Sequence, residues 1–249
     1  MRFFLTLSYK GTAYHGWQVQ NNAPSVQGTL QRALGTLIGE PVGIVGAGRT
    51  DTGVHAAYYV AHFDTESEKP LATDFVYHLN AVLPKDIAVD GIQRVPDDAH
   101  ARFSAVLREY KYYVLPKKDP FRIDTAYFYP LPLDVDRMNR AAAALTEYTD
   151  FESFCKLHGD NKTTICHVWE SVWEMQGNAL VYTVSADRFL RNMVRAIVGT
   201  LLDVGRGKLD LDGFRRVIEA KNRGAAGTSA PAHGLFLTDV RYPEELFNG

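Results

Sequence analysis

The feature that most constrains the fold is the order in which two hydrophobic periodicities follow one another. A period of two, typical of a strand, begins at Phe3, Leu5 and Leu7. A helical period follows over 25–39, where Ser25 can cap the helix and Gly39 can end it. Continued along the chain, the patterns predict strands at 3–9, 42–46, 54–63, 86–95, 104–115, 164–176, 179–186 and 235–242, and helices at 25–39, 71–82, 134–146, 189–204 and 210–221.

The predicted elements fall into two halves that both run roughly β-α-β-β-α-β, the order of a ferredoxin-like unit. The halves share no evident residue identity, so the repeat is one of architecture. No low-complexity linker separates them, which favours a shared sheet or tight packing. We therefore predict an α+β fold of two ferredoxin-like halves, residues 1–103 and 104–249, sharing a central, mostly antiparallel sheet.

The composition is that of a globular protein. The 249 residues are 46% hydrophobic with a net charge of -2, which excludes a disordered chain. The apolar start is too short for a signal peptide, and the longest apolar region, 196–202, is too short to cross a bilayer. Cys155 and Cys166, even with His158 and His167 nearby, fit no familiar zinc spacing. We expect a cytoplasmic protein that has no membrane contact and no metal.

Residues 46–57 form the most unusual segment. Three glycines within eight residues indicate a tight loop, and it carries Arg49 and Asp51 between two apolar strands. A P-loop is excluded because the residues that follow are strand-like, whereas the P-loop opens a helix. The dinucleotide fingerprint fails because Asp51 stands at its third glycine. Asp51-Thr52-Gly53 matches an aspartic protease motif, but the chain has no second copy to share a proton.

The loop therefore offers a lone carboxylate beside a guanidinium, which suits a nucleophile better than a general acid. In detail, the segment resembles the signature of the TruA family of tRNA pseudouridine synthases. Further resemblances to that family follow in its order over nearly the whole chain: 9–20, 25–27, 83–87, 100–105, 110–112, 189–199 and 230–235. Two departures are visible, Lys10 where the family usually has Asp and Thr52 where Ala is common.

The resemblance implies an enzyme that isomerises uridine to pseudouridine at positions 38, 39 and 40 of the tRNA anticodon arm, without metal or redox cofactor. It implies that Asp51 is the nucleophile and that Arg195 pairs with it. Tyr110 would stack on the target base and assist proton removal. Arg49 would help to flip and hold the nucleotide, and Leu235 would pack against the flipped base. A homodimer is implied as well.

Physical reasoning supports the same residues. An enzyme that acts on a stacked uridine must extrude it, and aromatic stacking can offset the cost of unstacking. Alternation places Tyr110 and Tyr112 on one face of a strand. Arg195 lies at the edge of an apolar helical stripe, where an ordinary surface arginine would also fit. Two alternatives remain open: an RNA-binding module that has kept the scaffold, and a hydrolase that uses Asp51.

The net charge conceals local basic segments. Residues 102–122 hold six Lys and Arg against two acidic residues, and residues 188–208 hold five against one. The segment from Arg215 to Arg223 holds four against one. These clusters flank Tyr110 and Arg195, so a near-neutral chain can still present a basic RNA-binding groove.

Overall fold

The computed structural model describes residues 1–156 and 163–247, which form an α+β fold. Within this part of the chain, the strands are β1 (Arg2–Tyr9), β2 (Ile44–Gly46), β3 (His55–Asp64), β4 (Ile87–Val95), β5 (Leu107–Leu115), β6 (Tyr127–Phe128), β7 (Val168–Gln176), β8 (Ala179–Ala186) and β9 (Leu235–Arg241). The helices are α1 (Val26–Ile38), α2 (Phe75–Val82), α3 (Val135–Ala144), α4 (Met193–Gly205) and α5 (Leu211–Glu219). Every strand and helix predicted from the sequence is present.

The chain divides into two compact units. The first unit comprises Met1–Val106 and the described residues from Leu237 on, and the second comprises Leu107–Phe236. The chain passes from the second unit back to the first within β9.

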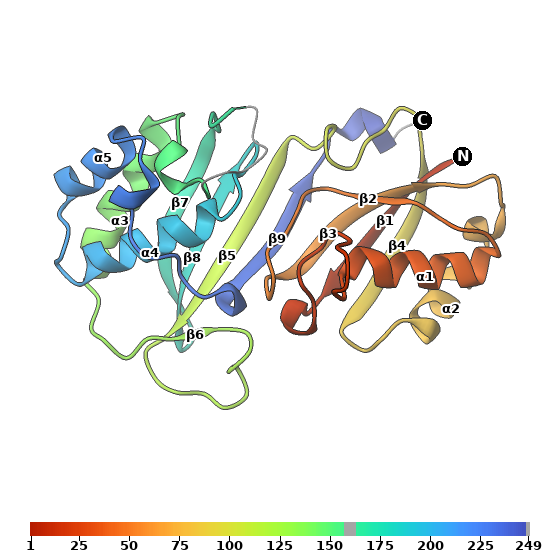
Figure 1. Cartoon of the computed structure of the whole chain (residues 1–249), viewed down its shortest axis with the longest axis horizontal. Coiled ribbons are helices and arrows are strands. Elements are labelled where there is room, and N and C mark those ends of the chain that lie inside the picture. Colours follow the sequence, from red (N-terminus) through yellow and green to blue (C-terminus); the bar gives the residue numbers. More distant parts are fainter. Residues whose placement is uncertain (157–162, 248–249) are drawn as a thin grey trace. The chain divides into compact units, whose positions relative to one another are not determined.

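In the first unit, β1 lies between β3 and β4 and is antiparallel to both. Leu5, for example, is paired with Ala61 on β3 and with Ile92 on β4. β2 pairs antiparallel with β3, and β9 follows β3 in the strand order. The helices α1 and α2 contact each other and pack beside these strands (Figure 1). The predicted cap of α1 is confirmed, since Ser25 Oγ accepts the Gly28 N–H at 3.2 Å.

In the second unit, β8 lies between β5 and β7, again with antiparallel pairing. The three helices α3, α4 and α5 pack against one another, and α3 also packs on β7. One side chain joins α3 to that strand. Asn139 accepts the Trp173 N–H at 2.7 Å and donates to the Trp173 carbonyl at 2.9 Å. The strand β8 is buried along its whole length, as the central strand of a covered sheet should be.

Some boundaries differ from the prediction. The helix predicted to begin at residue 189 begins at Met193, because Asn192 has φ +67°, which a right-handed helix does not accept. The strand predicted from residue 104 begins at Leu107, and the strand predicted from residue 164 begins at Val168. The two-residue strand β6 was not predicted, since two residues carry no period. It pairs parallel with β5.

Candidate active site

Asp51 lies in the loop between β2 and β3, at the start of a tight turn. The Val54 N–H donates to the Asp51 carbonyl at 3.1 Å, and Gly53 has φ +78°. A positive φ at the third position of such a turn is the reason for a glycine there. Arg49 is exposed and Asp51 is half-buried. The loop therefore presents the guanidinium and the carboxylate on a short, constrained stretch of backbone.

Two aromatic side chains, Tyr59 and Trp17, pack against this loop. Tyr59 on β3 is fully buried, and its hydroxyl donates to the Gly48 carbonyl and lies 3.4 Å from the Gly48 nitrogen. The Trp17 ring stacks on the Tyr59 ring with centroids 4.1 Å apart. A Cβ at Gly46 would collide with both side chains, so this position requires glycine. The backbone before Asp51 thus rests directly on two rigid rings.

The segment 9–20 at the end of β1, called here the N-terminal loop, also contacts the loop of Asp51. The Tyr9 hydroxyl is 2.9 Å from Thr50 Oγ1, and the backbone N–H of Trp17 donates to the Thr50 carbonyl at 3.3 Å. Next to the turn, buried His55 accepts the Gly11 N–H on Nδ1 at 2.9 Å. His55 is therefore part of the support, and Trp17 belongs to the core.

The segment 83–87 supports this N-terminal loop in turn. The Tyr14 hydroxyl donates to Asp86 Oδ1 at 2.8 Å, and the Lys10 N–H donates to the Asp86 carbonyl at 2.8 Å. Burial and the Asp86 carboxylate raise the pKa of Tyr14, so the phenol stays a donor. Three sequence segments that were singled out separately are thus joined in one bonded network around the loop of Asp51.

Tyr110 lies on β5 in the second unit, paired across the sheet with Val184. The Phe189 ring meets it edge-on, with centroids 5.1 Å apart and an interplanar angle of 89°. Tyr110 is half-buried, so part of the side chain is accessible. Phe189 orients the phenol through contact with its ring.

Arg195 and Leu235 are linked by the segment 230–235. Arg195 Nε donates to the Ala230 carbonyl at 2.7 Å, and the Ala230 N–H donates back to the Arg195 carbonyl at 2.9 Å. The Tyr112 hydroxyl donates to the Pro231 carbonyl at 2.8 Å, and burial raises the pKa of this tyrosine. Leu235, buried at the start of β9, closes the segment. Arg195 is therefore a fixed side chain on α4.

The structure places Arg49 and Asp51 in one loop of the first unit, and Tyr110, Arg195 and Leu235 in the second unit. Sequence reasoning missed the supporting role of Tyr59 and the contact of Phe189 with Tyr110. Tyr59 and Phe63 lie four positions apart and so share one face of a strand, which is a signal for an inward-facing ring. No sequence pattern indicates which carbonyl its hydroxyl would reach.

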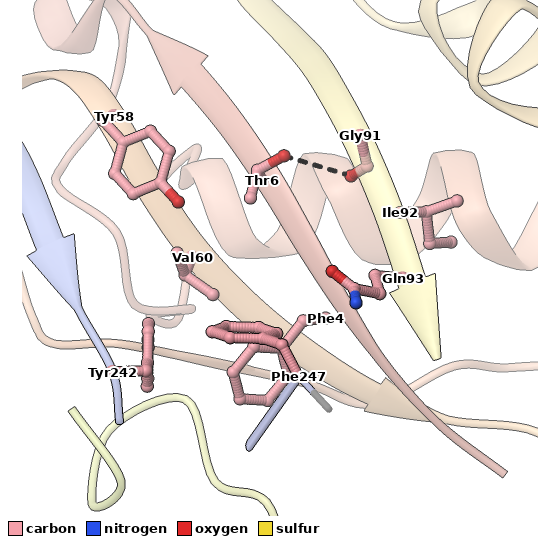
Figure 2. A pocket seen from close by; sticks show the side chains of 9 residues that line it. All are labelled: Phe4, Thr6, Tyr58, Val60, Gly91, Ile92, Gln93, Tyr242 and Phe247. Carbon is pink, nitrogen blue, oxygen red and sulfur yellow. Dashed lines mark hydrogen bonds between the residues drawn. The ribbon is translucent and has the colours of Figure 1, made fainter. Parts of the chain in front are cut away.

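A hollow of about 270 Å³ also lies on the first unit, and none of its lining residues belongs to the loop of Asp51. Figure 2 shows Phe4, Tyr58 and Val60 in front of the strands, with a helix behind the strands. Aromatic rings from Phe4, Tyr58, Tyr242 and Phe247 line much of it, and Thr6 and Gln93 are among the polar residues. None of the described residues that line it is charged, so its chemistry does not suit a phosphate.

Within residues 1–156 and 163–247, no group of three or more His, Cys, Asp or Glu side chains has the arrangement of a metal site. Cys166 is buried, which raises the pKa of its thiol to about 12. His158, which the sequence placed near the two cysteines, lies outside the described residues. None of the helices in the described chain is both long and apolar enough to span a bilayer.

Comparison with known proteins identifies the family to which the chain belongs. A family model described as tRNA pseudouridine synthase matches residues 6–104 and 141–243. The chain is 56% identical to tRNA pseudouridine synthase A of Parabacteroides distasonis, over 99% of this chain and 98% of the relative. It is 54% identical to the protein of that name from Bacteroides fragilis, over 99% and 98% of the two chains. It is 43% identical to the Bacillus subtilis protein of the same name, over 97% and 99%.

These matches define a pseudouridine synthase, and they extend over nearly the full length of the relatives. The chain belongs to the TruA family of tRNA pseudouridine synthases, which are isomerases. The family predicted from residues 46–56 and the segments around it is confirmed.

Proposed function

We propose that this protein isomerises uridine to pseudouridine at positions 38, 39 and 40 of the tRNA anticodon stem-loop. The observation that carries the proposal is the loop of Asp51, whose backbone before the carboxylate is held in place by the Tyr59 hydroxyl and by residues of the segment 9–20. Such preorganisation suits a group that must attack one atom of a bound nucleotide. A protein that only bound RNA would have no use for it.

In the proposed reaction, the target uridine is flipped out of its stack before Asp51 attacks either C6 or C1′. The N1–C1′ bond then breaks, the uracil turns, and C5 bonds to C1′. C5 loses a proton and N1 ends with one, so no atom is gained or lost overall. No redox step occurs, so we propose that no cofactor takes part.

The other site residues take roles around that attack. Tyr110, oriented by Phe189, stacks on the base and takes part in removing the C5 proton. Arg195 pairs with Asp51, and its planar, permanently charged guanidinium suits that task. Arg49 holds the flipped nucleotide, and Leu235 packs against the base. We further propose a cytoplasmic homodimer whose chains each contain two ferredoxin-like halves, residues 1–103 and 104–249, sharing one sheet.

The test follows the proton that leaves C5. A tRNA transcript tritiated at uracil C5 is incubated with the wild type, with Asp51→Ala and with the matched control Thr52→Ala. Tritium release by the wild type and the control, with none by Asp51→Ala, is the expected result, because only Asp51 forms the covalent bond. Binding of tRNA with no release by the wild type would contradict the proposal and favour an RNA-binding module.

A further inference from the structure

The segment between β5 and β6 forms an ordered loop on the second unit. Its ends meet where Val114 pairs with Tyr127 and Leu115 with Phe128, and the Tyr129 N–H donates to the Leu115 carbonyl at 2.8 Å. The segment extends away from the strands as a wide loop (Figure 1). A surface loop with joined ends has the form of an Ω-loop, a class that is frequently functional.

The tip of this loop is fixed by its own hydrogen bonds. Asp119 Oδ1 accepts the Phe121 N–H at 2.9 Å, and the Asp119 carbonyl accepts the Arg122 N–H at 3.2 Å. Further along, the Ala126 N–H donates to the Arg122 carbonyl at 3.0 Å, and Ala126 is buried. The turn therefore holds its side chains outward from an anchored base.

The tip exposes an aromatic ring between positive charges. Phe121 is 95% exposed and Ile123 is 65% exposed, so neither side chain gains much burial from the fold. Lys117 and Lys118 are exposed on the same loop, which with Arg122 carries three basic residues against two acidic ones, Asp119 and Asp124. The Arg122 guanidinium lies 5.2 Å from the centre of the Tyr113 ring on β5. This cation–π contact holds a third positive charge beside the strand.

We propose that this loop is an RNA contact outside the reacting nucleotide, in which Phe121 stacks on a base and Lys117 and Lys118 bind phosphates. An exposed aromatic ring within a basic strip is the combination by which proteins bind unpaired nucleotides without reading their sequence. The inference rests on the proposed function for its substrate, but it concerns a loop that contains none of the proposed site residues. A second copy of the chain is disfavoured as the occupant, because the lysines of the two copies would repel each other.

The test compares the affinity for an unmodified tRNA transcript, measured by filter binding, across matched variants. We expect Phe121→Ala and Phe121→Leu to raise Kd about tenfold, because both remove the stacking ring. Phe121→Trp should bind about as well as the wild type. The control is Tyr77→Ala on α2, which removes a side chain that is 73% exposed. Tyr77 follows the acidic N-cap residue Asp74, and no lysine stands among residues 73–76 before it. Its Kd should not change.

A second measurement isolates the two lysines. Replacing Lys117 and Lys118 together with Ala should lower the slope of log Kd against log salt by roughly 1.4 to 1.8, the contribution of two phosphate contacts. Phe121→Ala should leave that slope unchanged. An unchanged slope in the double lysine variant would overturn the phosphate contacts.

Two outcomes would overturn the stacking contact. One is a wild-type Kd for Phe121→Ala. The other is rescue by Phe121→Leu with a changed oligomeric state in light scattering, which would identify an apolar contact between copies.

Tritium release separates this inference from the proposed function. Release with no effect of Phe121 removes only the loop contact, whereas binding through Phe121 without release removes only the catalytic role.

Discussion

Tyr59 gives one buried hydroxyl a large influence on the loop of Asp51. Its oxygen lies against both the carbonyl and the nitrogen of Gly48, three residues before the carboxylate. A displacement of that backbone moves Asp51 relative to any bound nucleotide, and small displacements cost rate steeply when reacting atoms must be aligned. We regard Tyr59 as a positioning residue that acts through the loop.

Tyr59→Phe should lower kcat about tenfold and leave KM for tRNA nearly unchanged, because the carboxylate is displaced while the RNA surface is intact. The matched control is Tyr182→Phe, which also removes a buried tyrosine hydroxyl, one bonded to Ser171 Oγ at 2.7 Å in the second unit. Each variant should lose about 1–2 kcal/mol of unfolding free energy. Equal kcat losses in the two would show that Tyr59 acts only through stability.

At the scale of elements, a histidine on β3 holds the segment 100–105 in place. His62 is buried, and its Nδ1 accepts the Ala101 N–H at 3.1 Å. A protonated ring could not accept that bond. Burial, with smaller contributions from Arg2 and His100, lowers the pKa of His62 to about 4. The strand and the segment are therefore joined by a neutral imidazole.

This predicts a pH dependence of stability. The folded-state pKa of His62 lies below its unfolded value of about 6.5, so the unfolded chain takes up the proton first as pH falls. Stability should decline between about pH 6.5 and 4, by roughly 1–3 kcal/mol from this group. Urea unfolding at several pH values checks it. His62→Gln, which keeps an acceptor but does not titrate, should show a smaller decline, and an equal decline would assign the effect elsewhere.

At the scale of the whole molecule, charge is arranged locally and the net value of -2 conceals it. The affinity for tRNA should fall as salt rises from about 50 to 200 mM, because phosphate contacts release counterions. Measuring Kd across that range gives the number of contacts from the slope. An affinity that did not respond to salt would contradict a basic RNA-binding surface.

The sequence predicted the elements well because their apolar periods are long and regular, as in β1 and α1. It placed Asp51 in a tight loop because closely spaced glycines and charges between two apolar strands are typical of such a loop. It could not place β6, which has two residues, or the start of α4, where one residue, Asn192, adopts a positive φ. It also could not give the bonds of Tyr59 or of Tyr14 with Asp86, because these depend on how distant segments pack.

The path of the chain through the first unit affects how that unit can form during synthesis. Its last strand, β9, brings Leu237 and Val240 into the core, and the Tyr242 hydroxyl donates to the Ala101 carbonyl at 2.6 Å. These residues leave the ribosome only after the whole of Leu107–Phe236 has been translated. The unit that begins synthesis first is therefore the last to be completed, and the edge of β3 that pairs with β9 stays unpaired until β9 has been translated.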